Sequence, residues 1–230
     1  MIDFNNYPLS QAHEAQGIVV VIDVLRAFTT AAFAFDAGAD KIYLVARVEE
    51  AIQLRDKIPG SLIMGEDKAF KPERFDFGNS PADISRIDLT DKTLIQRTSA
   101  GTQGIVRVVH ADLILAASFV VAKATADYIR MLNPQVVSFI ITGVSLGRDG
   151  DEDRACAEYI EALVKNKHPD SQEYIKRVRE SSVGRMFLAG RDTRFQLQDL
   201  TLSIQVDRFP NPLIVRTENK RLVMDQWTSG

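Results

Sequence analysis

The sequence has few of the residues that build soft-metal sites or disulfide frameworks. Its 230 residues include one cysteine, Cys156, and three histidines. An internal disulfide needs two cysteines, and a zinc site built from cysteine and histidine needs several such ligands close together. Any metal that the protein binds is therefore expected to be held by oxygen atoms, as magnesium, manganese and calcium are.

The chain also lacks a strong charge imbalance and a long apolar run. The formal net charge is -3, which argues against a general nucleic-acid binder, because such proteins carry a basic face. No apolar run reaches the roughly 18 residues that cross a bilayer. The N-terminus shows no basic region followed by an apolar core, the pattern of a signal peptide. We expect a cytoplasmic protein without a nucleic-acid or membrane partner.

The sequence does show a regular alternation of short apolar strands and amphipathic helices. A run of β-branched residues at 18–22 is followed by an alanine-rich stretch at 27–37, and the alternation continues to about residue 165. This pattern predicts an α/β fold with a mostly parallel or mixed sheet flanked by helices. Further strands are expected near 2–4 and at 41–46, 62–64, 93–96, 113–116 and 136–141, and helices at 48–58, 105–109, 120–131 and 151–165.

The C-terminal part follows a different pattern. The charged segment 170–183 predicts a helix, and 187–202 predicts another helix or an irregular cover. Two short apolar runs, 213–215 and 222–224, are separated by polar residues and predict a β-hairpin. We treat 1–230 as a single domain in which the part from residue 170 onward is a cover or arm. The hairpin would add antiparallel strands or reach a partner, which would make a homodimer natural.

Polar and charged residues gather at the predicted ends of the strands. Asp23 and Arg26 follow the strand at 18–22, and Glu66 follows the strand at 62–64. Because the carboxyl ends of parallel strands share one edge of a sheet, we expect these side chains to meet in one crevice. The other residues at such ends are Asp67, Thr98, Ser99, Gly101, Thr102, Ser118, Glu152 and Asp153.

The residue types at these ends favour phosphate chemistry with a metal ion. Several are carboxylates, which repel one another unless a cation or protons are present, and oxygen ligands suit Mg²⁺. Hydroxyls and backbone N–H groups of 98–102, at the start of a helix, are typical of a phosphate cradle. Arg26 or Arg97 would add a bidentate contact. Together these groups predict phosphoryl transfer or hydrolysis.

Each motif also has a simpler interpretation. Asp23 would cap the following helix and pair with Arg26. The 98–102 segment would be an ordinary helix N-terminus, and Glu66 would lie in a surface turn. The acidic residues 151–153 would complement the dipole of the helix that they begin. These alternatives stay open at the level of the sequence.

An irregular segment, 68–81, fits neither a helical nor a strand period. A stretch of this length inside a compact domain is usually a functional loop or disordered, and its aromatic residues argue against disorder. Phe75 and Phe77 are expected to fill the core rather than to stack on a ligand. Asn79 begins an Asn-Ser-Pro sequence that would simply initiate a turn or helix.

Taken together, the motifs resemble the 2-phosphosulfolactate phosphatase family. The chain has no Gly-x-Gly-x-x-Gly fingerprint, P-loop or Gly-x-Ser-x-Gly elbow. The family's stretches occur in order and cover about residues 18 to 165. They are Ile22-Asp-Val-Leu-Arg-Ala-Phe-Thr-Thr30, Gly65-Glu66, Phe75-Asp-Phe-Gly-Asn-Ser-Pro81, Thr98-Ser-Ala-Gly-Thr102, Ser118 and Glu152-Asp-Arg-Ala-Cys-Ala157.

The resemblance implies a Mg²⁺-dependent enzyme of coenzyme M biosynthesis that hydrolyses 2-phosphosulfolactate to 3-sulfolactate and phosphate. Asp23 would be a metal ligand or the nucleophile. Glu66 and Asp153 would be metal ligands, with Glu152 as an alternate. Arg26 would bind phosphate or a second anionic group of the substrate. The remaining assignments are a phosphate cradle of Thr98, Ser99, Gly101, Thr102 and Ser118, and a pocket shaped by Asp76 and Asn79, which would also orient water.

The chain departs from the family pattern at three places. Ala100 stands where a side-chain amide is usual, the loop 67–71 is less glycine-rich than usual, and the segment 143–148 replaces a different run of residues after the strand at 136–141. These departures leave three alternatives open. The protein would be a binding or regulatory protein that has lost the chemistry, a phosphotransferase, or a phosphatase for a different small phosphoester.

Overall fold

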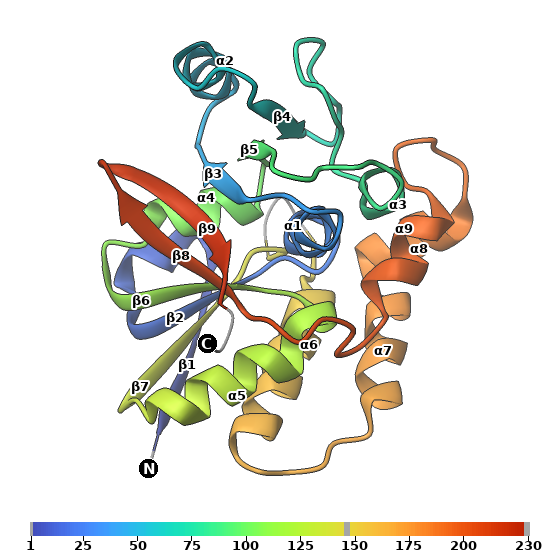
Figure 1. Cartoon of the computed structure of the whole chain (residues 1–230). Helices are drawn as coiled ribbons and strands as arrows, with labels where there is room; N and C mark the ends of the chain where they lie inside the picture. The colour runs from blue at the N-terminus through green and yellow to red at the C-terminus, as the bar shows by residue number, and fades with distance from the viewer. Residues whose placement is uncertain (1, 145–147, 228–230) are drawn as a thin grey trace.

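The computed structural model describes residues 2–144 and 148–227, and it confirms the predicted α/β class (Figure 1). The described strands form one mixed sheet. Their bounds are β1 (Asp3–Pro8), β2 (Gln16–Ile22), β3 (Lys41–Leu44), β4 (Leu62–Gly65), β5 (Thr93–Arg97), β6 (His110–Ala117), β7 (Val136–Ile141), β8 (Leu213–Glu218) and β9 (Arg221–Gln226).

The predicted helices are present, and the segment 170–203 of the C-terminal part is mostly helical. The segment 187–202, for which a helix or an irregular cover was expected, holds the end of one helix, a loop and a second short helix. Two 3₁₀ turns lie at Leu9–Glu14 and Phe119–Val121. The α-helices are α1 (Ala27–Asp36), α2 (Val48–Lys57), α3 (Pro81–Ile84), α4 (Gly101–Arg107), α5 (Ala122–Leu132), α6 (Asp151–Val164), α7 (Ser171–Glu180), α8 (Ser182–Ala189) and α9 (Leu197–Ser203).

The predicted C-terminal hairpin is confirmed, and it lies in the middle of the sheet. The strand order is β1-β7-β2-β6-β8-β9-β3-β5-β4. Strand β8 pairs antiparallel with β6, and β9 pairs antiparallel with β3. The turn between them uses Asn219 and Lys220, both with positive φ, as a tight two-residue hairpin turn requires. The hairpin therefore joins two groups of parallel strands and is not a projecting arm.

This insertion changes the expected arrangement of strand ends. Because β8 and β9 are antiparallel to each other and to their outer neighbours, the group β1-β7-β2-β6 and the group β3-β5-β4 run in opposite directions. Over the five steps from β2 to β5, a twist of about 20° a step turns the strand direction by about 100°. The carboxyl ends of the two groups thereby approach each other instead of sharing one straight edge.

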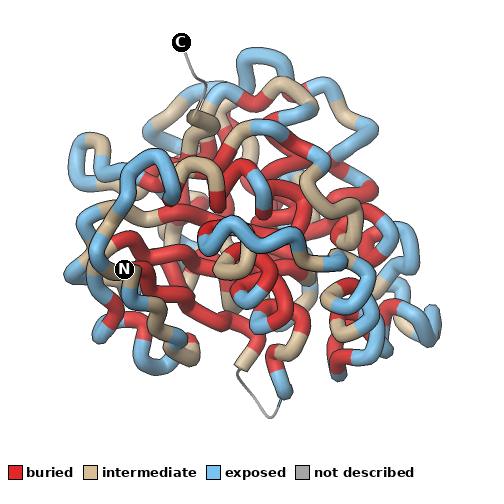
Figure 2. Tube along the Cα trace, turned by 90° about the horizontal axis from the view of Figure 1, so that it is seen from below, coloured by how far each residue is buried: buried red, intermediate tan, exposed pale blue. Residues whose placement is uncertain are grey.

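Helix α1 occupies the space that the two groups of strands enclose. Every residue from Ala27 to Phe35 is buried, and one hydrophobic cluster joins α1 to β2, β4, β5 and the hairpin. The tube in Figure 2 shows buried segments running through the middle of the molecule. A helix that is apolar on all sides is stable only inside a protein, which explains the alanine-rich composition of this stretch.

The outer faces of the sheet carry the other helices. Helices α5 and α6 cover the β2 and β7 side, with α7 and α8 packed beyond them (Figure 1). Helix α2 covers β3, β4 and β5 in a third cluster that includes Phe75, while Phe77 packs on the central cluster. The prediction that these two aromatic residues fill the core is confirmed, and the buried Cys156 likewise packs in the core.

Among the described residues, no helix combines the length and the apolar character that a bilayer crossing requires. The single-domain organisation, the cytoplasmic location and the homodimer stay predictions.

Candidate functional site

A cavity of about 120 Å³ lies where the carboxyl ends of β2, β4 and β5 approach one another. It brings together five residues that the sequence predicted, from stretches up to 76 positions apart in the chain. One wall is apolar and comes from Leu25, Val183, Met186 and Phe195. The predicted residues that line the cavity are Asp23, Arg26, Glu66, Asn79 and Ser99.

Asp23 lies just before the N-terminus of α1 with 6% of its surface exposed. Its Oδ1 atom accepts a 2.9 Å hydrogen bond from the amide of Ala27, so the capping interpretation is correct for this residue. Burial, opposed by the amides of Ala27 and Gly101 and assisted by the charge of Glu66, raises the pKa of Asp23 to about 6. A carboxylate in this state readily accepts a cation or a proton.

The start of α4 lies directly against Asp23. A Cβ atom at Gly101 would lie 2.6 Å from Ala27 Cβ and 2.9 Å from Asp23 Oδ2. These separations are shorter than van der Waals contact, so α1 and α4 approach this closely only because residue 101 is glycine. The glycine of the predicted cradle thus acts by letting the two helix starts meet.

Glu66 is a buried anchor and not a surface turn residue. Its Oε1 accepts a 2.5 Å hydrogen bond from the amide of Ser99, and its Oε2 accepts bonds from the Ser99 hydroxyl at 3.0 Å and the Ala69 amide at 2.6 Å. Arg97, the alternative phosphate ligand, instead donates to Asp67 at 2.8 Å. Both oxygens of Glu66 are therefore used to hold the loops after β4 and β5 together.

The two threonines of the predicted cradle bind each other instead of facing the cavity. The amide of Thr98 donates to Thr102 Oγ1 at 2.8 Å, and the amide of Thr102 donates to Thr98 Oγ1 at 3.0 Å. Both residues are buried, and neither lines the cavity. The ordinary helix N-terminus is the better description of these two side chains.

Ser118 is fully buried, and its Oγ atom has no hydrogen-bond partner among the described residues. It follows Ala117, which pairs with Ile22 at the end of β2, so it lies beside Asp23 in register. Its hydroxyl does not line the cavity.

Two carboxylates at the start of α6 lie near Asp23. Asp153 accepts hydrogen bonds from the Val24 amide at 2.8 Å and the Gly143 amide at 2.7 Å, which ties the end of β2 to the end of β7. Burial and the charges of Glu152 and Asp23 raise the pKa of Asp153 well above its ordinary value. Burial, together with the charge of Asp149, raises the pKa of Glu152 to about 7.

The donor set fits a magnesium ion with few protein ligands. Within the described ranges, no three His, Cys, Asp or Glu side chains gather as a metal cluster. Glu152 Oε2 is nevertheless buried without a hydrogen-bond partner there, and Asp23 is among the charges that raise its pKa. Mg²⁺ is usually held by one or two carboxylates with water and phosphate oxygens completing its shell. Asp23 and Glu152 are the two carboxylates that suit this role.

Asp76 does not reach the cavity. Its Oδ2 atom accepts a 2.7 Å hydrogen bond from the amide of Ile63 and lies 3.8 Å from Arg55 Nη1 on α2. The carboxylate thus fastens the irregular loop to β4, and it is left out of the site. Asn79 does line the cavity, and its buried Oδ1 atom has no partner in the described part of the chain.

Two charged residues belong to the site although the sequence did not single them out. Arg148 lines the cavity, and its charge lowers the pKa of Asp23. Its position after β7 was a usable signal. Asp199 pairs with Arg26 at 2.6 Å, so the expected pair of Arg26 with Asp23 is wrong. No pattern in 187–202 indicated the role of Asp199. Residues 145–147, which belong to the segment 143–148 that departs from the family pattern, lie outside the described residues.

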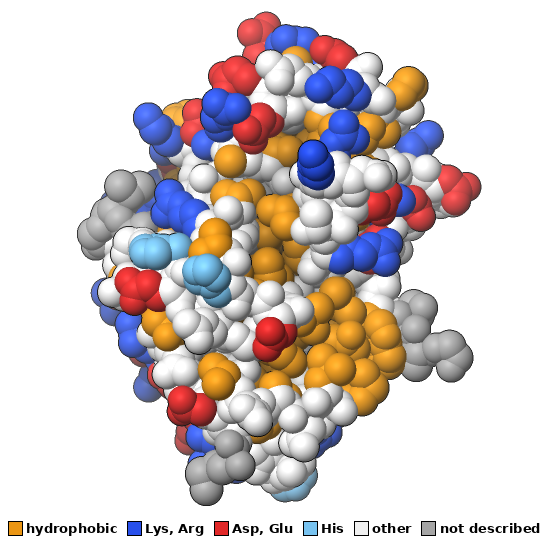
Figure 3. Space-filling view, turned by 90° about the vertical axis from the view of Figure 1, so that its left-hand side faces the viewer, with side chains coloured by type: hydrophobic (Ala, Val, Ile, Leu, Met, Phe, Trp, Pro, Cys, Tyr) orange, Lys and Arg blue, Asp and Glu red, His pale blue; other side chains and the backbone are white. Residues whose placement is uncertain are grey.

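A second hollow, of about 390 Å³, lies between α2, β3 and the turn of the hairpin. Figure 3 looks onto the side of the molecule that carries these elements, where hydrophobic side chains line a depression. None of the predicted site residues lines it.

Comparison with known proteins assigns the class. The family model described as 2-phosphosulpholactate phosphatase matches residues 5–203, and the chain belongs to this family. The predicted family and the predicted enzyme class, a phosphoric monoester hydrolase, are confirmed.

Several curated relatives carry the name "Probable 2-phosphosulfolactate phosphatase". The Bacillus subtilis protein is 36% identical over 186 residues, which cover 80% of each chain. The Carboxydothermus hydrogenoformans protein is 42% identical over 166 residues, 71% of this chain and 67% of the relative. The Thermoplasma acidophilum protein is 30% identical over 190 residues, 83% of this chain and 82% of the relative.

Proposed function

We propose that the protein hydrolyses 2-phosphosulfolactate to 3-sulfolactate and phosphate, a step of coenzyme M biosynthesis. The observation that carries this proposal is the cavity itself, in which two arginines and a carboxylate of raised pKa meet. Arg26 and Arg148 supply positive charge for the phosphate group. Asn79 Oδ1, buried without a partner among the described residues, would accept a hydrogen bond from a water molecule or a substrate hydroxyl. Arginine binds phosphate oxygens through two parallel N–H groups, which gives both affinity and orientation.

Asp23 is the group closest to the chemistry in this proposal. It acts either as the nucleophile toward phosphorus or as a metal ligand. Both roles need an ionised carboxylate, and the amides of Ala27 and Gly101 favour that form. Its burial limits access of bulk water to the reacting atoms, which strengthens electrostatic interactions inside the cavity.

We include Mg²⁺ in the proposal as the cofactor, held by Asp23 and Glu152. When bound, the ion supplies charge stabilisation to the phosphoryl oxygens. Glu66 and Asp153 are assigned a supporting role, because their oxygens already accept backbone hydrogen bonds that shape the loops. Ser99 belongs with Glu66, since its amide and hydroxyl both donate to that carboxylate.

A second candidate substrate class is favoured by the apolar wall of the cavity. Leu25, Val183 and Met186 face the polar half, and such a wall accommodates a hydrocarbon group better than a sulfonate. A small phosphomonoester with an apolar substituent is therefore the alternative to 2-phosphosulfolactate.

Phosphate release from 2-phosphosulfolactate and from a panel of small phosphomonoesters tests the proposal. We expect turnover that Mg²⁺ supports and EDTA abolishes, with the preferred ester identifying the substrate. Transfer of the phosphoryl group to an acceptor other than water would replace the hydrolase by a phosphotransferase. A folded protein that binds Mg²⁺ and these esters without turning any of them over would contradict the proposal and favour a binding protein.

A further inference from the structure

A buried carboxylate outside all the predicted motifs pairs with the arginine of the cavity. Asp199 on α9 has no exposed surface. Its Oδ2 atom accepts a 2.6 Å hydrogen bond from Arg26 Nη1. Its Oδ1 atom accepts bonds from the hydroxyl of Ser80 at 2.6 Å and the amide of Ala82 at 3.1 Å. Both oxygens are held, so the carboxylate has one orientation.

The partners of Asp199 come from distant parts of the chain. Ser80 caps α3 and directly follows Asn79, whereas Arg26 directly precedes α1. Helix α9 packs against both α3 and α8. Asp199 therefore ties the loop that carries Asn79 and the segment that carries Arg26 to one fixed point behind the cavity.

Arg26 is constrained from a second direction as well. Its guanidinium carbon lies 5.3 Å from the centre of the Phe187 ring on α8. This is a cation–π contact, in which the face of the ring attracts the guanidinium. A guanidinium has five N–H donors. Among the described residues, Asp199 is the acceptor for one of its nitrogens, Nη1. The other donors remain for a ligand, and Arg26 lines the cavity with 8% of its surface exposed.

We propose that Asp199 is a positioning residue, which holds Arg26 so that its free N–H groups bind the phosphate group of the substrate. The inference rests on the proposed function, because it assumes a phosphate ester in this cavity. Asp199 does not line the cavity and acts only through Arg26. A planar fork selects the position of an anion only when its own orientation is fixed, and the ion pair and the Phe187 ring fix it here.

The variant Asp199→Asn tests the proposal with little change in side-chain volume. An asparagine keeps an acceptor for Ser80 or for Arg26 but loses the charge that pairs with the guanidinium. We expect KM for the phosphoester and Kd for orthovanadate to rise about 10²-fold, the loss expected when a guanidinium no longer makes its charge-assisted hydrogen bonds to the anion. We expect kcat to change much less.

The matched control is Asp207→Asn. Asp207 also joins separate elements, because it accepts hydrogen bonds from the amide of Lys123 and the hydroxyl of Tyr159, and it lies outside the cavity. We expect this variant to lower the thermal midpoint of unfolding without changing KM or the vanadate Kd. The comparison separates a loss of stability from a loss of positioning.

Chemical rescue provides a readout that a purely structural role would not move. In Arg26→Ala, added methylguanidinium should occupy the vacated place beside Asp199 and restore vanadate binding. In Arg26→Ala combined with Asp199→Asn, it should not. If Asp199→Asn does not fold, Ser80→Ala replaces it, because this variant keeps the ion pair and removes one donor to Asp199. It should raise the vanadate Kd about fivefold, the equivalent of one ordinary hydrogen bond.

The outcomes separate this inference from the proposed function. An active wild-type enzyme with an unchanged vanadate Kd in folded Asp199→Asn, or rescue that does not depend on Asp199, would overturn the inference alone. A wild-type protein that neither hydrolyses phosphoesters nor binds vanadate or inorganic phosphate would overturn the proposed function.

Discussion

At the scale of single residues, the carboxylates near the cavity differ in how many of their oxygens are already used. Glu66 and Asp153 accept backbone hydrogen bonds on both oxygens. Glu152 has one oxygen without a partner among the described residues. Asp23 lines the cavity, and its Oδ1 accepts from the amide of Ala27, while the amide of Gly101 also favours its ionised form. A carboxylate with a free oxygen is therefore a better candidate for binding a metal or substrate, because an oxygen that already accepts a hydrogen bond has less capacity for a ligand.

The first prediction concerns Asp23 and Asp76, two aspartates from motifs that the family resemblance makes equally prominent. We expect Asp23→Asn to lower kcat by at least about 10²-fold, because an amide neither attacks phosphorus nor holds a metal as a carboxylate does. We expect Asp76→Asn to stay within about threefold of wild type, since Asp76 bonds to Ile63 outside the cavity. Steady-state phosphate release measures both. Near wild-type activity of Asp23→Asn would contradict the assignment.

The second prediction is a dependence of stability on pH in the metal-free protein. Asp23 and Glu152 have pKa values of about 6 and about 7 in the fold, above their ordinary values of 3.8 and 4.5. Between these limits the folded protein holds protons that the unfolded chain has released, so the free energy of unfolding rises as the pH falls. The gain is complete below about pH 4 for these groups and is lost above about pH 7.

Thermal unfolding between about pH 5 and pH 8 in the presence of EDTA measures this effect. The variants Asp23→Asn and Glu152→Gln should each reduce the slope, because each removes one of the titrating groups. Added Mg²⁺ should also reduce it if the ion pairs with these carboxylates. A thermal midpoint that rises from pH 5 to pH 8 by the same amount in all variants would contradict the expected sign.

At the scale of elements, the contact between the starts of α1 and α4 decides the shape of the site. These two helices follow strands of opposite groups, β2 and β5, so their meeting point is where the halves of the sheet join. Gly101 permits the contact, since a Cβ atom there would lie 2.6 Å from Ala27 Cβ. Adding one methyl group should therefore displace α4 and the Ser99 loop from Asp23.

The third prediction compares two glycine substitutions. We expect Gly101→Ala to lower the free energy of unfolding by about 1–3 kcal/mol, the usual cost of overpacking a core, and to reduce activity. Gly78→Ala is the control, because among the described residues its Cβ atom would meet Lys71 Cβ alone, at an ordinary 3.9 Å. Urea unfolding measures both variants. Equal stabilities would show that α4 shifts without cost.

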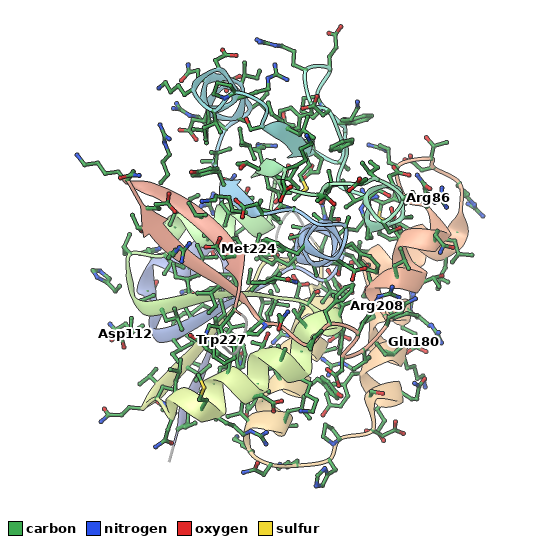
Figure 4. The ribbon with its side chains drawn as sticks, viewed as in Figure 1. Arg86, Asp112, Glu180, Arg208, Met224 and Trp227 are labelled. Atoms are coloured by element: carbon green, nitrogen blue, oxygen red, sulfur yellow. The ribbon has the colours of Figure 1, made fainter. Side chains whose placement is uncertain are left out.

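At the scale of the whole molecule, the hairpin holds two groups of strands together. Met224 on β9 lies beside α1 in Figure 4 and is fully buried in the central cluster. Neighbouring Val223 is also fully buried, on the opposite face with the β3 and α2 cluster. The hairpin thus contributes to the core on both faces of the sheet, and loosening it should affect the whole protein.

The fourth prediction tests this role with Met224→Ala. We expect a loss of about 2–5 kcal/mol in the free energy of unfolding, the range for truncating a buried methionine, with both groups of strands unfolding in one transition. Arg216→Ala on β8 is the control, because Arg216 is 60% exposed in its ion pair with Asp225 and exposed pairs contribute about 0–1 kcal/mol. Circular dichroism and tryptophan fluorescence in urea follow the transition. Two separate transitions, with part of the protein still folded after the first, would contradict the role of the hairpin in joining the two groups of strands.

Local pattern was enough to predict most strands and helices of this protein. The β-branched run at 18–22 and the alanine-rich stretch at 27–37 form β2 and α1 because period and composition determine which faces are apolar. The same pattern placed Asp23, Arg26, Glu66 and Ser99 at strand ends, and these residues do meet. Side chains at strand ends are predictable because neighbouring residues in the sequence determine where a strand ends and the next helix begins.

Only the tertiary structure decided which of those side chains face the cavity. Thr98 and Thr102 bind each other, and Asp76 turns to Ile63, because hydrogen-bond partners are chosen by packing and not by position in a motif. The place of the hairpin and the pairing of Arg26 with Asp199 depend on contacts between residues far apart in the chain. Such contacts leave no periodic trace in the sequence, since they arise from how separate apolar faces assemble.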